Sequence, residues 1–297
     1  MADKKVALAL HVLGGDIHIS PAPLAGSMSQ SGVYRAHIGA HDAVVKVTTA
    51  DGEQDNARRE LAFYQTLADQ VPVRTPRLLR YADNDDLTAL VLSAHTPAAP
   101  AAQWDPSDWL EVAMQLAALH SFPDPEGAIW RWRPWLHRIL EDPPIRLAHD
   151  YWSHTEAADC IDGVLDAAER LPQELSAVPD CFVHGDCHVD NFLRDGDNFI
   201  WTDWQVTGIG SPAGDLSFLW GRANSDNADP PRDAMLHEYA AARGIDPDPL
   251  RRSLMAAELG TLLFGSPEYA KYHTQHERDR STHRLIQLIA DWNKLLN

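Results

Sequence analysis

Two acids and an amide in the second half of the chain stand at a spacing that suits phosphoryl transfer. Asp186 precedes Asn191 by five positions, and Asp203 follows twelve residues later. Phosphoryl transfer from ATP needs an acceptor for the proton of the attacking hydroxyl and oxygen ligands for the Mg²⁺ ions at the β- and γ-phosphates. Asp186 can meet the first need, and Asn191 with Asp203 can meet the second. The spacing Asp-x-x-x-x-Asn lets a base and a metal-binding amide reach opposite sides of one phosphate.

Short strands are predicted on both sides of this loop. Residues 181–183 and 192–194 have the composition of strands, and residues 198–202 form a third strand that ends at Asp203. The turn at 195–198, Asp-Gly-Asp-Asn, is of the hairpin type. We therefore expect a rigid hairpin to hold the loop.

The loop also carries a family signature. Its pattern, His-Gly-Asp-x-His-x-x-Asn, is matched by His184, Gly185, Asp186, His188 and Asn191. At these residues the chain resembles the aminoglycoside phosphotransferase family. The resemblance implies that the first aspartate is the catalytic base and that the asparagine and the later Asp203 bind magnesium. We expect both histidines to be hydrogen-bonded, structural imidazoles.

By order of elements the resemblance covers nearly the whole chain, although its specific motifs are confined to residues 181–216. It implies an α+β, two-lobed protein-kinase-like fold. Residues 1–96 would form a small nucleotide-binding lobe of antiparallel sheet and helix, and residues 97–297 a larger, mostly helical lobe for catalysis and substrate binding. A Gly-rich stretch, 208–214, closes on Asp215, which we expect to brace the loop by hydrogen bonding without touching ATP.

A small-residue turn at 24–32 follows a first strand expected at 16–20 and precedes a hairpin of strands at 33–38 and 43–47. Small residues let backbone N–H groups approach phosphate oxygens. This turn lacks both Gly-x-Gly-x-x-Gly and the Walker sequence, so an ordinary hairpin turn is the alternative. The hydroxyl groups that could bind triphosphate are those of Ser27, Ser29 and Ser31.

Lys46 lies inside a β-branched strand, and a buried lysine needs an anion. The resemblance implies that it pairs with the α- and β-phosphates and with a helix glutamate. The helix predicted over 54–68 offers Glu60 as the partner, with Glu53 as the alternative.

Strands predicted at 77–82 and 87–92 complete five strands in the first lobe. Residues 93–95, from Ser93 to His95, should then form the hinge, where backbone N–H and C=O groups would meet the adenine edge. Periodic apolar residues predict helices in the second lobe over 109–120, 154–170, 232–243, 247–264 and 281–296.

Composition agrees with a globular cytoplasmic enzyme. The chain has 297 residues, of which 44% are hydrophobic and 23% charged, and its three cysteines have no framework spacing. A signal peptide over residues 1–13 is rejected because His11 interrupts the apolar run and Asp16 follows it. No stretch approaches the ~20 apolar residues of a membrane span.

Negative charge is concentrated in the second lobe. Residues 1–96 carry 9 Lys and Arg against 11 Asp and Glu, whereas residues 97–297 carry 16 against 32. Such a field repels nucleic acid and anionic membranes and attracts cations. We therefore expect a hydroxylated cation as the acceptor, for which a polyamine antibiotic is suitable; an acidic surface kept for solubility is the alternative.

The sequence thus predicts a small-molecule kinase that uses ATP or GTP with Mg²⁺, acts on an aminoglycoside or other antibiotic, and is a monomer or homodimer. A kinase for a metabolite such as an amino sugar, choline or homoserine is the first alternative, and a non-catalytic nucleotide-binding module is the second. Position alone suggests acceptor contacts at Trp220, Asp226 and Glu268. A zinc site would have to use Cys181, His184, Cys187 and His188, whose spacing lacks two separated ligand pairs.

Overall fold

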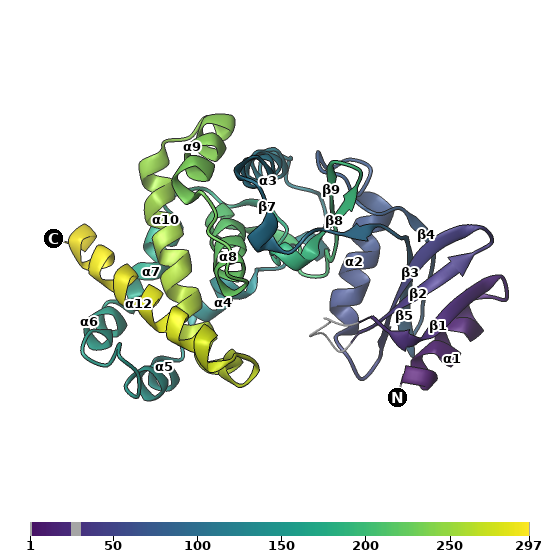
Figure 1. Cartoon of the computed structure of the whole chain (residues 1–297), viewed down its shortest axis with the longest axis horizontal. Coiled ribbons are helices and arrows are strands. Elements are labelled where there is room, and N and C mark those ends of the chain that lie inside the picture. Colours follow the sequence, from purple (N-terminus) through teal and green to yellow (C-terminus); the bar gives the residue numbers. More distant parts are fainter. Residues whose placement is uncertain (1, 25–30, 297) are drawn as a thin grey trace. The chain divides into compact units, whose positions relative to one another are not determined.

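A computed structural model of the chain describes residues 2–24 and 31–296. Two compact units make up the chain (Figure 1). The first unit comprises Met1–Ala98 and Asp190–Thr207, and the second comprises Ala99–Val189 and Gly208–Asn297. The chain therefore passes between the units three times, and the segment with the predicted metal ligands belongs to the first unit. Nucleotide and acceptor binding by separate lobes stays a prediction.

An antiparallel five-stranded sheet forms the centre of the first unit, in the order β1-β2-β3-β5-β4. Each strand was predicted, and the observed bounds differ by a few residues at most. Apolar residues on alternate positions place one set of side chains on each face of the sheet. The strands are β1 (Ile17–Pro23), β2 (Gly32–Ile38), β3 (His41–Thr49), β4 (Leu78–Asp83) and β5 (Leu87–Ser93).

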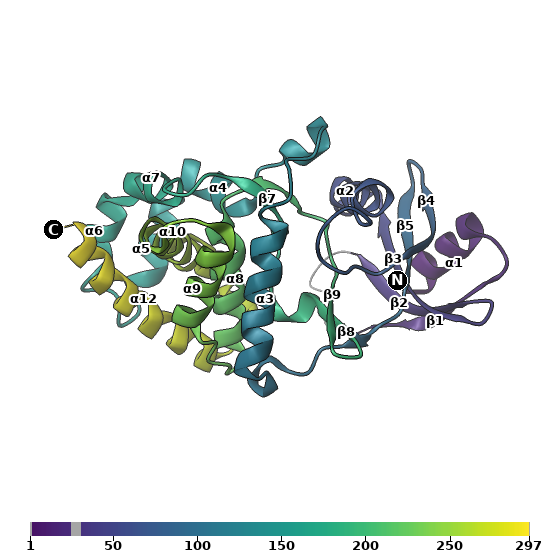
Figure 2. The ribbon, with the colours of Figure 1, turned by 90° about the horizontal axis from the view of Figure 1, so that it is seen from above.

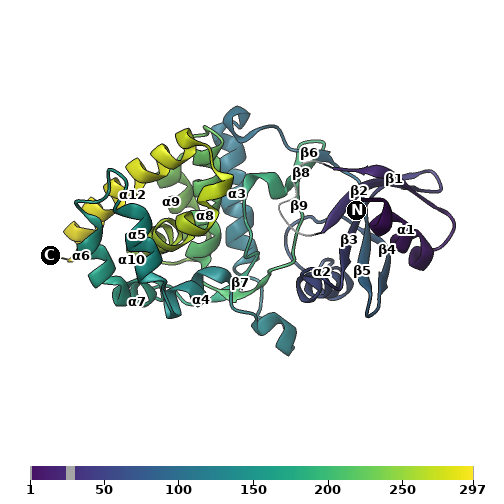
Figure 3. The same ribbon diagram turned by 90° about the horizontal axis from the view of Figure 1, so that it is seen from below.

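Two helices cover the two faces of this sheet (Figure 3). α1 (Ala2–Leu13), which was not predicted, buries Val6, Ala9 and Leu13 in a core shared with Val45 and other inward residues of the sheet. Their spacing of three and four residues is that of one helix face. α2 (Gln54–Thr66) lies on the opposite face, as expected for the helix with the lysine's partner.

A second, three-stranded sheet completes the first unit. Its strands are β6 (Thr96–Pro97), β8 (Phe192–Asp195) and β9 (Asn198–Trp201). The β8–β9 hairpin was predicted, and Gly196 supplies the positive φ of 58° that its tight turn requires. The strand before the predicted catalytic loop, β7 (Cys181–Val183), pairs instead with β10 (Gly208–Gly210) in the second unit.

The second unit is mostly helical, and α3 packs along α9 while α10 contacts both α8 and α9 (Figures 1 and 2). Its longer helices are α3 (Pro106–Leu119), α8 (Pro212–Ser225), α9 (Arg232–Arg243), α10 (Pro247–Gly260) and α12 (Gln275–Leu296). Shorter ones are α4 (Trp135–Glu141), α5 (Ile145–Trp152), α6 (Ile161–Asp166), α7 (Leu171–Leu175) and α11 (Ser266–Tyr269). The predicted α+β class is confirmed.

Three predicted helices differ from the observed ones, and one of them, expected over 281–296, begins already at Gln275. The helix expected over 154–170 begins only at Ile161, because the hydroxyl of Thr155 bonds to the carbonyl of Trp152 and to the amide of Ala157 in place of a helical turn. The helix expected over 247–264 ends at Gly260 and continues as one π-helical turn, Thr261–Gly265. Within the described ranges, no helix has the length and apolarity needed to cross a bilayer.

Candidate active site

A buried cluster in the first unit is centred on the ammonium group of Lys46. Lys46 lies in β3, where strand alternation turns it to the face opposite Val45 and towards α2. Its Nζ atom lies 2.7 Å from Oε2 of Glu60 and 2.6 Å from Oδ1 of Asp203. Glu53, the alternative partner, is instead bonded to the side chain of Asn56 at the start of α2. The helix glutamate, the strand lysine and the acid after β9 therefore meet at one point.

The charges of this cluster do not balance, because one ammonium faces two carboxylates. Burial lowers the pKa of Lys46, but the attraction of Asp203 and Glu60 outweighs it and leaves that pKa above its ordinary value. Burial raises the pKa of Glu60 to about 7, although Lys46 lowers it. Lys46 is therefore charged, and an added cation would relieve the excess of negative charge.

The backbone at Asp203 is held in an unusual conformation. Its φ of 67° lies in the left-handed region, which few residues other than glycine adopt. The next residue, Trp204, stacks on Phe63 of α2 with ring centroids 4.0 Å apart. Arg59 of α2 donates to the carbonyl of Gln205 at 2.9 Å. Helix α2 thus fixes the strained turn that presents the Asp203 carboxylate.

Gln205 is a member of the cluster that the sequence did not suggest. Lys46 Nζ lies 3.4 Å from Oε1 of Gln205. The only signal in the sequence was its position two residues after Asp203, in a segment that the turn at Asp203 redirects towards α2. If the strand simply continued beyond Trp201, nothing in the sequence would lead one to expect Gln205 beside Lys46.

Asn191 and Asp203, the predicted metal ligands, lie at neighbouring ends of the β8–β9 hairpin. Phe192 pairs with Trp201 in this hairpin, so the residues just outside the pair are close. The amide of Thr202 donates to the carbonyl of Asn191 at 3.1 Å. The Asn191 side chain is buried in a 3₁₀ turn, Val189–Asn191. The pairing of β8 with β9 therefore brings the two candidate metal ligands together.

The predicted catalytic loop begins in the second unit, where Asp215 at the start of α8 holds it. Both carboxylate oxygens of Asp215 accept backbone bonds at 2.8 Å, one from His184 and one from Gly185. The φ of Gly185 is 82°, a conformation that a side chain would disfavour. The imidazole of His184 accepts from the amide of Asp186 at 3.3 Å. These hydrogen bonds hold the backbone that leads into Asp186, as expected of Asp215.

Asp186 presents its carboxylate at the end of this braced segment. The carboxylate is about a quarter exposed and lies 3.7 Å from Nε2 of His188. The ring of His188 meets Phe218 of α8 edge to face, with centroids 5.7 Å apart. Phe218 therefore supports the imidazole beside Asp186. Four residues of chain separate Asp186 from Asn191, which belongs to the first unit.

The family follows from a comparison with known sequences. Residues 22–254 match the model of the phosphotransferase enzyme family known as APH. The chain belongs to this family. It is accordingly a small-molecule phosphotransferase, a kinase whose acceptor is a hydroxyl group. A search of curated proteins found no match to its sequence.

Solved structures share the kinase-like fold with this APH phosphotransferase. An aminoglycoside phosphotransferase from Streptomyces rimosus, in complex with ADP and streptomycin, is 21% identical, with a TM-score of 0.58 over 88% of this chain and 99% of its own. Choline kinase from Cryptosporidium parvum is 11% identical, with a TM-score of 0.66 over 100% and 96% of the two chains. A microcompartment-associated aminopropanol kinase is 16% identical, with a TM-score of 0.67 over 97% and 94%. The predicted two-lobed kinase fold is confirmed.

Of the three serines predicted to bind triphosphate, the structure describes Ser31. Ser27 and Ser29 lie outside the described residues. The hydroxyl of Ser31 lies 2.7 Å from that of Thr48 in β3. Ser31 is therefore tied to the strand that carries Lys46.

Polar groups at the predicted hinge are engaged within the first unit. The amide of Ser93 donates to the carbonyl of Arg77, and its hydroxyl accepts from the amide of Arg77. The amide of Ala94 donates to the carbonyl of Asp42. Nε2 of His95 lies 3.0 Å from the Ser93 hydroxyl. Adenine recognition through the amides of Ser93 or Ala94 would need these bonds to open.

The three acceptor candidates differ in surroundings. Trp220 is buried in α8 and donates to the sulfur of Met235 at 3.3 Å, which argues against a direct contact with an acceptor. Asp226 directly follows α8 and is half-buried, and Glu268 lies exposed in α11. Position along the chain could not separate a core tryptophan from a surface one.

The alternative zinc site finds no support in the described part of the chain, where no three His, Cys, Asp or Glu side chains gather as a metal would require. Burial raises the pKa of the Cys187 thiol, so this group stays protonated. The Cys181 sulfur accepts from Arg243 at 3.7 Å. Both cysteines are therefore buried packing residues at the predicted catalytic loop.

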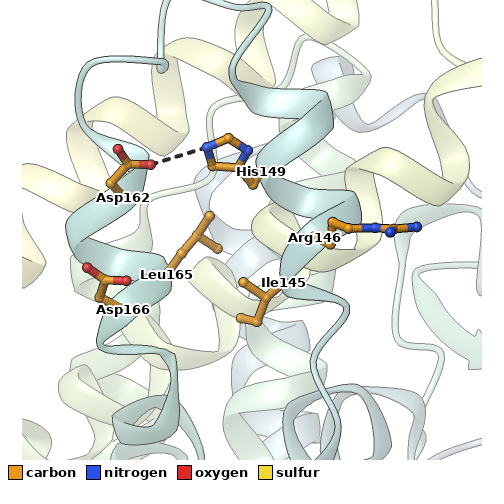
Figure 4. Close-up of a pocket in the computed structure, with 6 residues that line it drawn as sticks. All are labelled: Ile145, Arg146, His149, Asp162, Leu165 and Asp166. Carbon is orange, nitrogen blue, oxygen red and sulfur yellow. Dashed lines mark ion pairs between the residues drawn. The ribbon is translucent and has the colours of Figure 1, made fainter.

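A separate cavity of about 560 Å³ opens between α5 and α6 of the second unit (Figure 4). Nε2 of His149 lies 3.5 Å from Asp162, and the side chain of Arg146 points away from the other residues. The lining residues are Ile145, Arg146, His149, Asp162, Leu165 and Asp166. None of the predicted site residues belongs to it.

Proposed function

We propose that this phosphotransferase transfers the γ-phosphoryl group of ATP to a hydroxyl of a small cationic molecule, such as an aminoglycoside or another antibiotic. The observation that carries the proposal is the buried cluster of Lys46, Glu60 and Asp203. A lysine held by a helix glutamate beside a metal-binding aspartate is the arrangement that kinases use to hold the nucleotide phosphates.

Mg²⁺ fits the residues of the first unit. Asn191 and Asp203 supply amide and carboxylate oxygens, which hard cations prefer, and the one ammonium of Lys46 is shared by two acidic side chains. We infer that these two residues hold the metal with the β- and γ-phosphates. When bound, the ion would neutralise charge on the phosphate oxygens.

Asp186 would act as the base in the transfer. Its carboxylate accepts the proton of the acceptor hydroxyl while the hydroxyl oxygen forms a bond to the γ-phosphorus. The bond from this phosphorus to the β-phosphate oxygen breaks, and ADP leaves with the electron pair. Asp215 keeps the peptide groups of His184 and Gly185 in place, so the Asp186 carboxylate stays in one orientation.

Charge supports a cationic acceptor. Within the second unit, 28 Asp and Glu face 15 Lys and Arg, whereas the first unit has 15 against 10. The similar aminoglycoside phosphotransferase from Streptomyces rimosus is in complex with streptomycin. The similar enzyme from Cryptosporidium parvum is a choline kinase. Streptomycin and choline both carry positive charge and hydroxyl groups. The choline kinase equally favours the second candidate, a kinase for a cationic metabolite.

A screen of purified protein would test the proposal. Release of ADP would be followed with ATP or GTP, Mg²⁺, and a panel of aminoglycosides, choline, amino sugars and homoserine, with neutral macrolides as controls. Phosphorylation of an aminoglycoside supports the resistance role, and phosphorylation of choline or an amino sugar supports the metabolic role. Turnover of neutral or anionic compounds alone would contradict the cationic acceptor. Cytoplasmic location and the monomeric or dimeric state stay predictions.

A further inference from the structure

A buried chain of side chains joins α9 to the Asp215 brace within the second unit. His120 follows the last residue of α3 and is 2% exposed, and Tyr239 on α9 is fully buried. Nε2 of His120 lies 3.1 Å from Oδ2 of Asp215, and Nδ1 of His120 lies 2.7 Å from the hydroxyl of Tyr239. Arg243, one turn further along α9, donates to the same hydroxyl at 3.0 Å.

The donors and acceptors of this chain fix its direction. An ionised carboxylate only accepts, so Nε2 of His120 donates to Asp215. The other nitrogen of a neutral imidazole has a lone pair, and the hydroxyl of Tyr239 donates to it. The guanidinium of Arg243 can only donate, so the phenolic oxygen accepts from it. Every bond therefore points from Arg243 through Tyr239 and His120 towards Asp215.

Burial favours the neutral forms that this direction requires. It lowers the pKa of His120, even though Asp215 raises it. It also raises the pKa of the Tyr239 phenol, so the hydroxyl keeps its proton. With Tyr239 replaced by phenylalanine, Nδ1 of His120 would lose its donor, and the imidazole would be held on one side only, by its bond to Asp215.

Arg243 ties the chain to the loop by a second route. Its guanidinium also donates to the sulfur of Cys181, the first residue of β7. β7 leads directly into His184, whose amide Asp215 holds. The end of α9 thus contacts both the strand that enters the catalytic loop and, through two side chains, the carboxylate that fixes the loop.

We propose that Tyr239 is a positioning residue for phosphoryl transfer: by donating to Nδ1 of His120 it holds in place the imidazole that donates to Asp215, and Asp215 in turn fixes the backbone before Asp186. Arg243 has the same role one step further away. The inference rests on the proposed role of Asp186 as the base.

Removal of one hydroxyl tests the proposal. In Tyr239→Phe the ring keeps its packing, but the donor to His120 is lost. We expect kcat for ADP release from MgATP, with water as the acceptor, to fall on the order of tenfold, because small displacements of reacting groups are costly, while KM for MgATP stays within about a factor of two. Tyr151→Phe is the matched control, since Tyr151 is a half-buried tyrosine of the same unit that packs on Trp152.

A kcat of Tyr239→Phe within a factor of two of the wild type would overturn the proposal. Asp186→Ala is measured in parallel: if it keeps full turnover, the proposed function fails, and if it alone loses turnover, only the role of Tyr239 fails. Chemical shifts of the imidazole nitrogens in ¹⁵N-labelled protein, assigned with His120→Gln, give a readout independent of turnover and of the stability of Tyr239→Phe. A neutral His120 with its proton on Nε2 at pH 7 supports the proposal, and a proton on Nδ1 contradicts it.

Discussion

Lys46 and Asp203 form a direct ion pair, with Nζ of the lysine 2.6 Å from Oδ1 of the aspartate. The group predicted to hold phosphate and the group predicted to hold metal are therefore neighbours within the first unit. A bound phosphate and its metal ion would each find an opposite charge there. Because Glu60 also holds the lysine, its ammonium would stay in place if Asp203 turned its carboxylate to a metal.

Asp186→Ala or Asp186→Asn should lower kcat by on the order of 10²-fold or more, because the attacking hydroxyl loses its proton acceptor. Affinity for MgATP should change little, since the predicted phosphate and metal contacts belong to other residues. Steady-state kinetics together with calorimetry of nucleotide binding would measure both quantities. Turnover close to that of the wild type in both variants would show that the base lies elsewhere.

Nucleotide affinity should depend on Mg²⁺ through Asp203. Calorimetry should show that EDTA weakens ATP binding to the wild type, and that Asp203→Ala binds ATP with nearly the same affinity with or without the metal. Asp197→Ala, which alters an exposed acid in the β8–β9 turn, is the matched control and should keep the metal dependence. An unchanged Mg²⁺ dependence in Asp203→Ala would contradict this assignment.

Glu258 should make the second unit sensitive to acid. Burial raises the pKa of this carboxyl, but bonds from Arg284 and the charge of Arg232 outweigh burial and leave the pKa below its ordinary value. Its stabilisation is therefore complete above the unfolded-state pKa, near 4.5, and is lost as the pH falls through the lower folded-state value.

Glu258→Gln should lower the free energy of unfolding at pH 7 by about 3 kcal/mol, since two arginines lose their counter-charge. Urea unfolding of both proteins between pH 3 and pH 7 would follow the difference, which should shrink towards the acid end. Glu156→Gln removes an exposed ion pair with His283 and should have almost no effect on the free energy of unfolding. A difference that stayed constant with pH would show that Glu258 is not the titrating group.

Salt should raise KM for the acceptor more than it changes kcat. Attraction between exposed charges is screened over a Debye length of about 8 Å at physiological ionic strength, and the second unit has nearly twice as many acids as bases. Initial rates at 20 mM and 500 mM salt, at saturating MgATP, would separate the two parameters. An acceptor KM that stayed constant or fell with salt would identify the acidic surface as a solubility feature.

Local patterns carried the predictions that the structure bears out. The β-branched residues around Lys46 predicted β3, and apolar residues at helical spacing predicted the helix that carries Glu60. The two-residue turn at Gly196 fixed the β8–β9 hairpin, and the hairpin brings Asn191 next to the residue before Asp203. Each of these relations depends on residues within one element or one turn, so the sequence contains them directly.

Relations between distant segments could not be read from the sequence. Tyr239 reaches His120 across 119 residues, and nothing in α9 distinguishes this tyrosine from any other core aromatic. Trp220 looked like a contact for the acceptor because the sequence does not reveal that Met235 covers its indole. Gln205 meets Lys46 only because the backbone at Asp203 turns into the left-handed region. Tertiary packing decides all three.

The three passages of the chain between its units affect how the protein is made. A ribosome that adds about 5–20 residues per second completes Ala98 roughly 5–20 s before Asp203. During this interval Lys46 and Glu60 have each other but not their third partner, and Phe63 has no tryptophan to cover it. We therefore expect the nascent first unit to expose an apolar, charged edge that chaperones can bind until Asp203 and Trp204 have emerged.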